Sequence, residues 1–220
     1  MVARRRLGIL ARQLAAGGAA GGGLERRVDE VLDTPGDGPH PLWAELDCGA
    51  IRHNVDASRR AAGDGVTLIA SIKGNGYGHG AVPVAMALAD AGVDWLWTGS
   101  FEDAIAIRAA GVESRIVMFA ASPAGMPALV AHGLTPTVHN EETAAAAASA
   151  ANASPDGVVG VFVKVDAGLG RLGVPLDGAV AFILRAAALP GVRVDGIYSH
   201  VSWPPTATLR ARHCLSVRGP

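Results

Sequence analysis

Short apolar runs rich in Val and Ile recur along the chain, and each is followed by a turn residue and a longer Ala-rich stretch. Six of these runs are predicted to be β-strands: residues 66–73, 93–99, 115–120, 134–139, 158–166 and 192–200. Their starts are 19 to 34 residues apart, which is the length of one strand, one helix and their connections. Strands joined in this way run parallel through right-handed crossovers, so the pattern predicts an α/β fold.

Two starts of the intervening helices can be read from capping residues. Ser100 precedes Asp103 in a box-like S-x-x-D arrangement, and Asn140 precedes two acidic residues that suit the first turn of a helix. Periodicity alone leaves open whether the strands form an open doubly wound sheet or a (β/α) barrel. A complete barrel has eight units and about 250 residues, whereas only 155 residues run from Val66 to the end of the sequence.

The two ends of the sequence differ from this repeating pattern. Residues 1–40 combine a Gly/Ala tract at 15–23 with a turn-rich stretch, and predict a poorly ordered, linker-like extension. The globular domain is predicted to cover residues 41–202. Residues 203–220 contain three arginines, two adjacent prolines and no acidic residue, so we expect an irregular tail, either a flexible one or a product of frame-shifted translation.

Composition excludes several classes of protein. The 220 residues include 19 basic and 20 acidic side chains, so a net charge of −1 excludes a nucleic-acid binder that relies on bulk charge. Half of the residues are hydrophobic, which excludes global disorder. The two cysteines, Cys48 and Cys214, are far apart and provide neither a disulfide framework nor a metal site, which favours a reducing, cytoplasmic setting. Arg12 interrupts the apolar stretch near the start and argues against a secretory signal.

The first candidate for chemistry is Lys73, one of only two lysines, at the predicted carboxyl end of the first strand. Parallel α/β folds build their sites at that end. Desolvation there lowers the pKa of a lysine and prepares its amine to attack an aldehyde, whereas a strand-end lysine that simply reaches solvent is the alternative. Tyr77 follows in a loop with four glycines, where its phenol could donate to a phosphate oxygen or merely fill the turn.

Two further clusters follow the fifth and sixth strands. Arg171 lies in the glycine-rich stretch 164–174, where it could bind a carboxylate bidentately or simply pair with Asp166 at the surface. Lys164, in the same stretch, is the rival lysine. His200 ends the sixth strand and could stack on a ring or exchange protons. We expect these residues to share one rim with Lys73.

Four segments resemble the motifs of alanine racemases. The sequence IKGNGYGHG is similar to their V-K-A-[DN]-A-Y-G-H-G, VDAGLGRLGV to V-D-T-G-M-G-R-L-G-V, GIYSH to G-[IFM]-x-T-H, and WAELDCGAIRHN to W-x-E-[IV]-D-L-x-A-[IL]-x-x-N. They occur in the family's order and cover residues 42–202. The resemblance implies a partial (β/α)8 TIM-type barrel of about six units, the N-terminal domain of an enzyme that interconverts L- and D-alanine with pyridoxal 5′-phosphate.

The resemblance also implies roles for individual residues. Lys73 is the expected catalytic residue and forms the Schiff base with the cofactor, which excludes Lys164 from that role. Tyr77 is expected to bind the phosphate, Arg171 the phenolic oxygen of the cofactor and the substrate carboxylate, and His200 the pyridine ring. The reaction would be proton abstraction at Cα with the cofactor as electron sink. The full-length family is expected to act on alanine as a head-to-tail homodimer, without nucleic acid or membrane partners.

This sequence departs from the family pattern in several places. Gly74 and Gly76 stand where alanines are usual, and we expect them to loosen the loop. Ala167 replaces a threonine. The last two barrel units and the C-terminal domain, with its tyrosine base, are not seen, so we expect a truncated chain that is inactive or nearly so. The alternatives are a non-racemising barrel that carries the cofactor and an inactive fragment.

Overall fold

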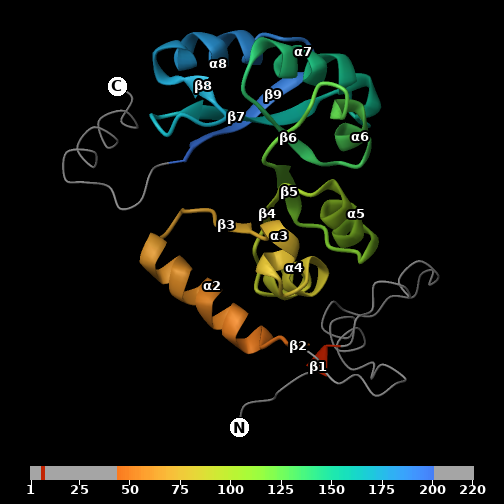
Figure 1. The fold of residues 1–220 in the computed structure, drawn as a ribbon, viewed down its shortest axis with the longest axis vertical. Helices are drawn as coiled ribbons and strands as arrows, with labels where there is room; N and C mark the ends of the chain where they lie inside the picture. The colour runs from red at the N-terminus through yellow and green to blue at the C-terminus, as the bar shows by residue number, and fades with distance from the viewer. Residues whose placement is uncertain (1–5, 8–43, 201–220) are drawn as a thin grey trace. The chain divides into compact units, whose positions relative to one another are not determined.

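The computed structural model describes residues 6–7 and 44–200 (Figure 1). These residues form two compact units, the first ending at Met118 and the second beginning at Phe119. Most of the predicted extension and all of the predicted tail lie outside the described residues, so the boundaries at 41 and 202 stay a prediction. In the described part of the chain, no helix is long and apolar enough to cross a membrane.

The first unit alternates helices and strands. A short antiparallel pair joins β1 (Arg6–Leu7) to β2 (Ala44–Glu45). A parallel sheet follows, with strands β3 (Ile69–Ser71), β4 (Trp95–Thr98) and β5 (Arg115–Met118). The helices are α2 (Cys48–Ala62), α3 (Lys73–Tyr77), α4 (Ala81–Asp90) and α5 (Phe101–Ala109).

The two faces of this sheet differ in burial. Leu96 and Ile116 lie side by side in register and are fully buried, and they form the apolar core of this unit together with helix residues such as Met86 and Ile107. On the opposite face Val117 is fully buried, but Ser71 is exposed and Trp95 is only half-buried. Trp97, in register with Ser71, is only half-buried there. This half-open face leads directly to Lys73.

The second unit is built around its longest strands. Its strands are β6 (Thr135–Val138), β7 (Val159–Asp166), β8 (Val174–Pro175) and β9 (Val192–Ser199). Its helices are α6 (Met126–Ala131), α7 (Glu141–Ala150) and α8 (Ala179–Ala187), with 3₁₀ turns at Ala151–Ala153 and Leu176–Gly178. Strand β7 pairs in parallel with β6, β8 and β9.

One face of this second sheet is covered by helices. Val161 and Val163 of β7 and Ala147 of α7 are fully buried, and Phe182 of α8 is buried. Helices α7 and α8 lie over the strands in Figure 1. The other face carries Phe162 opposite Gly196 and Lys164 opposite Tyr198. A glycine opposite a phenylalanine leaves room for the aromatic ring, and the next pair places a cation over a phenol.

All six predicted strands are present. The predicted strand 66–73 is shorter in the structure, because Val66 is exposed and the glycine-rich turn begins at Lys73. Strand β8 was not predicted, since it has only two residues and one of them is proline, which has no N–H to donate to a ladder.

Both predicted helix caps are present, with one difference. Ser100 Oγ accepts from Asp103 N at 3.0 Å, but Asp103 does not complete the box, because the N–H of Ser100 donates to Thr98 Oγ1 instead. Asn140 forms a complete capping box with Thr143.

Candidate functional site

The segment α3 (Lys73–Tyr77), which follows β3, is not a regular right-handed helix but a turn that winds in the left-handed sense. Gly74, Asn75, Gly76 and Tyr77 have φ of 63°, 54°, 62° and 54°, and Gly78 follows at 84°. This conformation is disfavoured for residues with a Cβ atom, least so for asparagine and not at all for glycine. Five successive residues of this kind turn the chain tightly and bring Tyr77 back toward the strand end that carries Lys73.

The structure corrects the expectation that Gly74 and Gly76 loosen this loop. At φ near +60° an alanine carries a steric cost that glycine avoids, so these glycines favour the observed turn over alternatives that alanine would prefer. A Cβ on Gly76 would also lie 3.2 Å from Val84 Cγ2, whereas a Cβ on Gly74 would meet nothing within 4 Å. Glycine at 76 therefore lets the turn pack against α4.

Lys73, Tyr77 and Ser71 lie together at the carboxyl end of β3. The Lys73 Nζ is 5.8 Å from the centroid of the Tyr77 ring. The Tyr77 hydroxyl donates to Ser71 Oγ at 3.5 Å, a long hydrogen bond. All three side chains are exposed, and Tyr77 retains 61% of its accessible surface. An amine and two hydroxyls are thus presented to solvent at one strand end.

Polar contacts tie this turn to the next helix. Asn75 Oδ1 accepts from the backbone N–H of Ala81 at 2.7 Å, at the start of α4. His79 Nδ1 lies 3.2 Å from the carbonyl oxygen of Gly76. This contact holds the His79 ring against the turn, just before α4 begins.

In the second unit, Asp166 organises the glycine-rich loop after β7. Its Oδ1 accepts from the backbone N–H groups of Gly168, Leu169 and Gly170 at 3.1, 2.9 and 3.2 Å. Desolvation acts to raise the pKa of Asp166, but the backbone donors outweigh it and hold the pKa below its ordinary value. Asp166 therefore stabilises the loop through its amides.

The other predicted site residues of this unit lie where the strands end. Arg171 is exposed in the loop between β7 and β8, and His200 directly follows β9 and is also exposed. Because β7 and β9 are parallel, both residues lie toward the same edge of the second sheet. The structure brings Lys73 and Tyr77 together in the first unit, and it places Arg171 and His200 toward one edge of the sheet in the second.

Lys164 has a different environment from Lys73. It is 7% exposed, and its Nζ lies 5.6 Å from the centroid of the Tyr198 ring. Burial lowers the pKa of Lys164, the charge of Arg171 lowers it further, and Asp166 partly opposes both. Its burial on a β-strand distinguishes it from the exposed lysine at 73.

Tyr198 connects Lys164 to the neighbouring strand. The hydroxyls of Tyr198 and Thr137 are 3.2 Å apart, and the phenol also donates to the carbonyl oxygen of Phe119 at 3.4 Å. Burial raises the pKa of Tyr198, and the Thr137 hydrogen bond and the charge of Arg171 only partly offset it. The phenol is therefore neutral and held by β6, which makes it a structural partner of Lys164.

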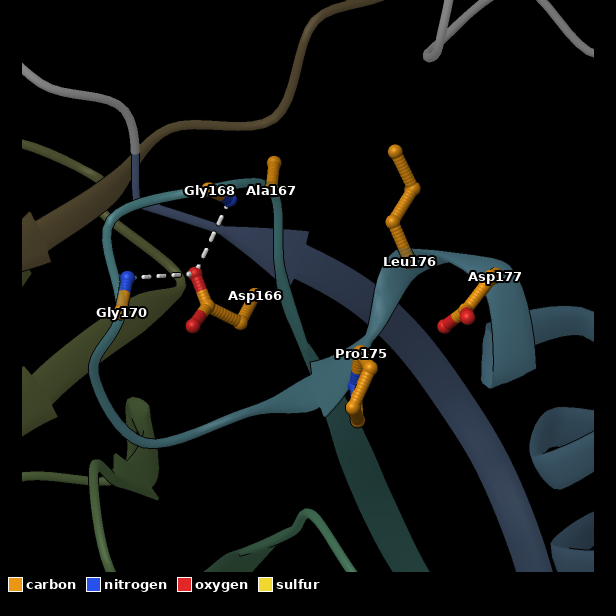
Figure 2. Close-up of a pocket in the computed structure, with 7 residues that line it drawn as sticks. All are labelled: Asp166, Ala167, Gly168, Gly170, Pro175, Leu176 and Asp177. Atoms are coloured by element: carbon orange, nitrogen blue, oxygen red, sulfur yellow. Dashed lines mark hydrogen bonds between the residues drawn. The ribbon is translucent and has the colours of Figure 1, made fainter.

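Figure 2 shows a cavity of about 620 Å³ beside the glycine-rich loop that follows β7. It is lined by Asp166, Ala167, Gly168, Gly170, Pro175, Leu176 and Asp177. The figure shows Asp166 directed at the loop amides rather than into open space. Neither Arg171 nor His200 lines this cavity, so the predicted cofactor-binding residues of this unit do not form its walls.

The sequence analysis missed Ser71 and Asn75. Ser71 lies two residues before Lys73, and alternation along a strand places such residues on one face. Asn75 lies between two glycines, and asparagine is the side chain that best tolerates a left-handed conformation. Either signal could have identified these residues.

Comparisons with known proteins agree with these motifs. A family model described as alanine racemase, N-terminal domain, matches residues 46–211. The alanine racemase of Desulfovibrio desulfuricans is 37% identical over 162 residues, which are 73% of this chain and 43% of that protein. That of Symbiobacterium thermophilum is 35% identical over 167 residues, 76% of this chain and 44% of that protein. This chain thus spans less than half the length of these curated relatives.

Solved structures give the same answer for the fold. The alanine racemase of Streptomyces lavendulae superposes with a TM-score of 0.66 at 32% identity, over 76% of this chain and 45% of that one. The alanine racemase of Clostridium difficile superposes with a TM-score of 0.69 at 23% identity, over 76% and 44%. The parallel strands with alternating helices therefore form part of a TIM-type α/β barrel, which confirms the predicted fold class.

Proposed function

Because this chain belongs to the alanine racemase family, we propose that it provides the cofactor-binding part of an enzyme that interconverts L- and D-alanine with pyridoxal 5′-phosphate. One observation carries the proposal: the left-handed turn after β3 holds the Tyr77 ring beside Lys73, with the ring centroid 5.8 Å from the Lys73 Nζ. This is the segment whose sequence resembles the family's lysine motif.

The residues present fit this cofactor. Its aldehyde needs an accessible amine, and Lys73 is exposed whereas Lys164 is buried. Its phosphate needs hydrogen-bond donors, and the exposed Tyr77 hydroxyl lies at the same strand end. The turn is open to solvent at Gly74 and Gly78, because a Cβ added at either residue would meet nothing within 4 Å.

Each residue has a separate task in this proposal. Lys73 would hold the cofactor through its amine until the amino group of the substrate replaces it, and the released amine would then move a proton to or from Cα of the amino acid. Tyr77 would donate to the phosphate, while Arg171 would orient the substrate carboxylate and bind the phenolic oxygen of the cofactor. His200 would lie against the pyridine ring. When bound, the cofactor supplies an electron sink that makes the Cα proton removable.

Racemisation also needs a second proton donor on the opposite face of Cα. The family resemblance assigns that group to a tyrosine of the C-terminal domain, beyond the segment that this chain matches. We therefore propose that residues 41–202 supply cofactor binding and one of the two proton transfers. The complete enzyme would be a cytoplasmic homodimer that provides D-alanine for the cell wall.

The test is to add pyridoxal 5′-phosphate to the purified chain, reduce with borohydride, and locate the adduct by peptide mass mapping. We expect one adduct on Lys73 and none in Lys73→Ala. The chain has only two lysines, so Lys164→Ala is the matched control and should leave labelling unchanged. Equal labelling of both lysines, or labelling that persists in Lys73→Ala, would contradict the proposal.

Isotope exchange then separates the proposed enzyme from a cofactor carrier. A specific Lys73 adduct together with exchange of the alanine Cα proton into deuterated solvent would support proton transfer by Lys73. A specific adduct without any such exchange would favour the non-racemising carrier.

A further inference from the structure

The exposed side chain of Ser71 contacts the left-handed turn that follows its own strand. It is the last residue of β3, its side chain is exposed, and it lies in register with Trp97 on the half-open face of the sheet. Its Oγ accepts the long hydrogen bond from the Tyr77 hydroxyl at 3.5 Å. The left-handed turn thus closes back on the strand that it leaves, and Ser71 is the residue that it meets.

The Tyr77 side chain needs an anchor if it is to act on a ligand. With 61% of its surface exposed, the ring has little packing to fix its orientation, and a mobile phenol loses entropy when it binds. The turn fixes the backbone of Tyr77 at φ 54°, but it does not fix the position of the hydroxyl. The contact with Ser71 does so.

We propose that Ser71 is a positioning residue, which holds the Tyr77 hydroxyl where it binds the phosphate of the cofactor. A serine hydroxyl can both accept and donate. Without an anion, Ser71 Oγ accepts a hydrogen bond from the Tyr77 hydroxyl, as in the structure. When the phenol turns its proton to a phosphate oxygen, Ser71 donates to the phenol oxygen instead. The two hydroxyls therefore stay paired in both states.

This inference rests on the proposed function, and it makes a narrower prediction. Ser71 acts on the phosphate through Tyr77, whereas Lys73 binds the aldehyde. Loss of the Ser71 hydroxyl should therefore weaken binding of pyridoxal 5′-phosphate but leave binding of pyridoxal, which has no phosphate, unchanged. A merely structural role for Ser71 would weaken both ligands equally.

The matched variants are Ser71→Thr and Ser71→Val, which have nearly the same shape and differ in a hydroxyl against a methyl. The dissociation constants of pyridoxal 5′-phosphate and pyridoxal are measured on the full chain by the absorbance of the Lys73 adduct. Each variant is also made in a Tyr77→Phe background. Ser71→Ala is a second hydroxyl-free variant in case the branched valine fails to fold, as judged by circular dichroism.

We expect Ser71→Thr to match the wild type. We expect Ser71→Val or Ser71→Ala to bind pyridoxal 5′-phosphate about three- to tenfold more weakly, the range for loss of one neutral hydrogen bond, with pyridoxal unaffected. In Tyr77→Phe the same substitutions should have no further effect.

Three results would overturn the inference while leaving the proposed function intact: unchanged affinity in the hydroxyl-free variants, equal weakening of both ligands, or an effect that persists in Tyr77→Phe. Absence of a Lys73 adduct in the wild type would instead overturn the proposed function, and this inference with it.

Discussion

The side-chain oxygen of Asn75 accepts a 2.7 Å hydrogen bond from the backbone N–H of Ala81, the first residue of α4. Asn75 also belongs to the left-handed turn, with φ of 54°. One side chain thus satisfies an N–H at the start of a helix, which has no partner within the helix, and fixes the turn that presents Lys73 and Tyr77.

Replacing Asn75 separates these two contributions. Asn75→Gly removes the side-chain hydrogen bond while keeping a residue that tolerates positive φ, and should cost about 1 kcal/mol of unfolding free energy. Asn75→Ala also places a Cβ-bearing residue without a polar group at positive φ, and should cost about 2 kcal/mol. Urea unfolding of both variants measures the difference. Equal stability of the two variants would show that the left-handed conformation carries no cost at this position.

Gly74 and Gly76 form a matched pair with almost the same φ, 63° and 62°. Gly74→Ala meets no neighbouring atom within 4 Å and should cost about 1 kcal/mol from the backbone alone. Gly76→Ala adds a 3.2 Å contact with Val84 Cγ2 and should cost about 2 kcal/mol in total. In a Val84→Ala background, that excess over Gly74→Ala should disappear. If the excess persists there, Val84 is not its cause.

The sequence predicted the strands better than it predicted the turns. Alternating Val-rich runs and Ala-rich stretches locate the strands because burial dictates that pattern along long segments. The conformation of the turn after Lys73 depends instead on backbone angles that a glycine permits but does not require. For that reason the sequence predicts that Gly74 and Gly76 loosen the loop, whereas in the structure their positive φ values avoid the steric cost that alanine would carry.

The same limit applies to the candidate site. Motif resemblance located Lys73, Tyr77, Arg171 and His200, and the structure places each of them at the end of a strand or in the loop that follows. Their roles stay predictions. Ser71 was missed because its interest depends on a contact with Tyr77, which only the folded turn creates.

Packing in the second unit gives a prediction about stability away from the site. A Cβ on Gly196 would lie 2.5 Å from Phe162 Cε1, so Gly196→Ala forces the ring to move and should cost about 2 kcal/mol. Gly178→Ala meets nothing within 4 Å and should stay within about 0.5 kcal/mol of the wild type. Thermal and urea unfolding compare the two. In Phe162→Leu, the smaller side chain should reduce the cost of Gly196→Ala; an unchanged cost would mean that the ring is not the obstacle.

Lys164 and His139 are coupled through charge. Burial lowers the pKa of His139, and the positive charge of Lys164 lowers it further. The pKa of Lys164 is itself lowered, by burial first and by Arg171 second. Between its lowered value and the ordinary 10.5, the unfolded chain binds more protons at this lysine than the folded chain. Lys164 therefore makes stability rise with pH across that alkaline interval, and Lys164→Met should remove this rise in unfolding measured at several pH values.

His139 also makes the stability of the fold rise with pH, but in a lower pH range than Lys164. Its folded pKa lies below the ordinary 6.5, so its contribution is favourable at neutral pH and is lost as the pH falls from 6.5 through the lowered value. Lys164→Met removes one of the two causes and should move the His139 midpoint upward, toward 6.5. An NMR titration of the imidazole Cε1–H resonance, assigned with His139→Gln, measures this midpoint.

Lys164→Arg keeps the positive charge and is the matched control, so its midpoint should stay at the wild-type value. A midpoint that does not change in Lys164→Met would show that the lysine charge does not reach the imidazole, and that burial alone lowers the pKa of His139. A midpoint that rises equally in both variants would assign the effect to altered packing of the lysine stem rather than to its charge, because arginine and methionine share only the loss of that stem.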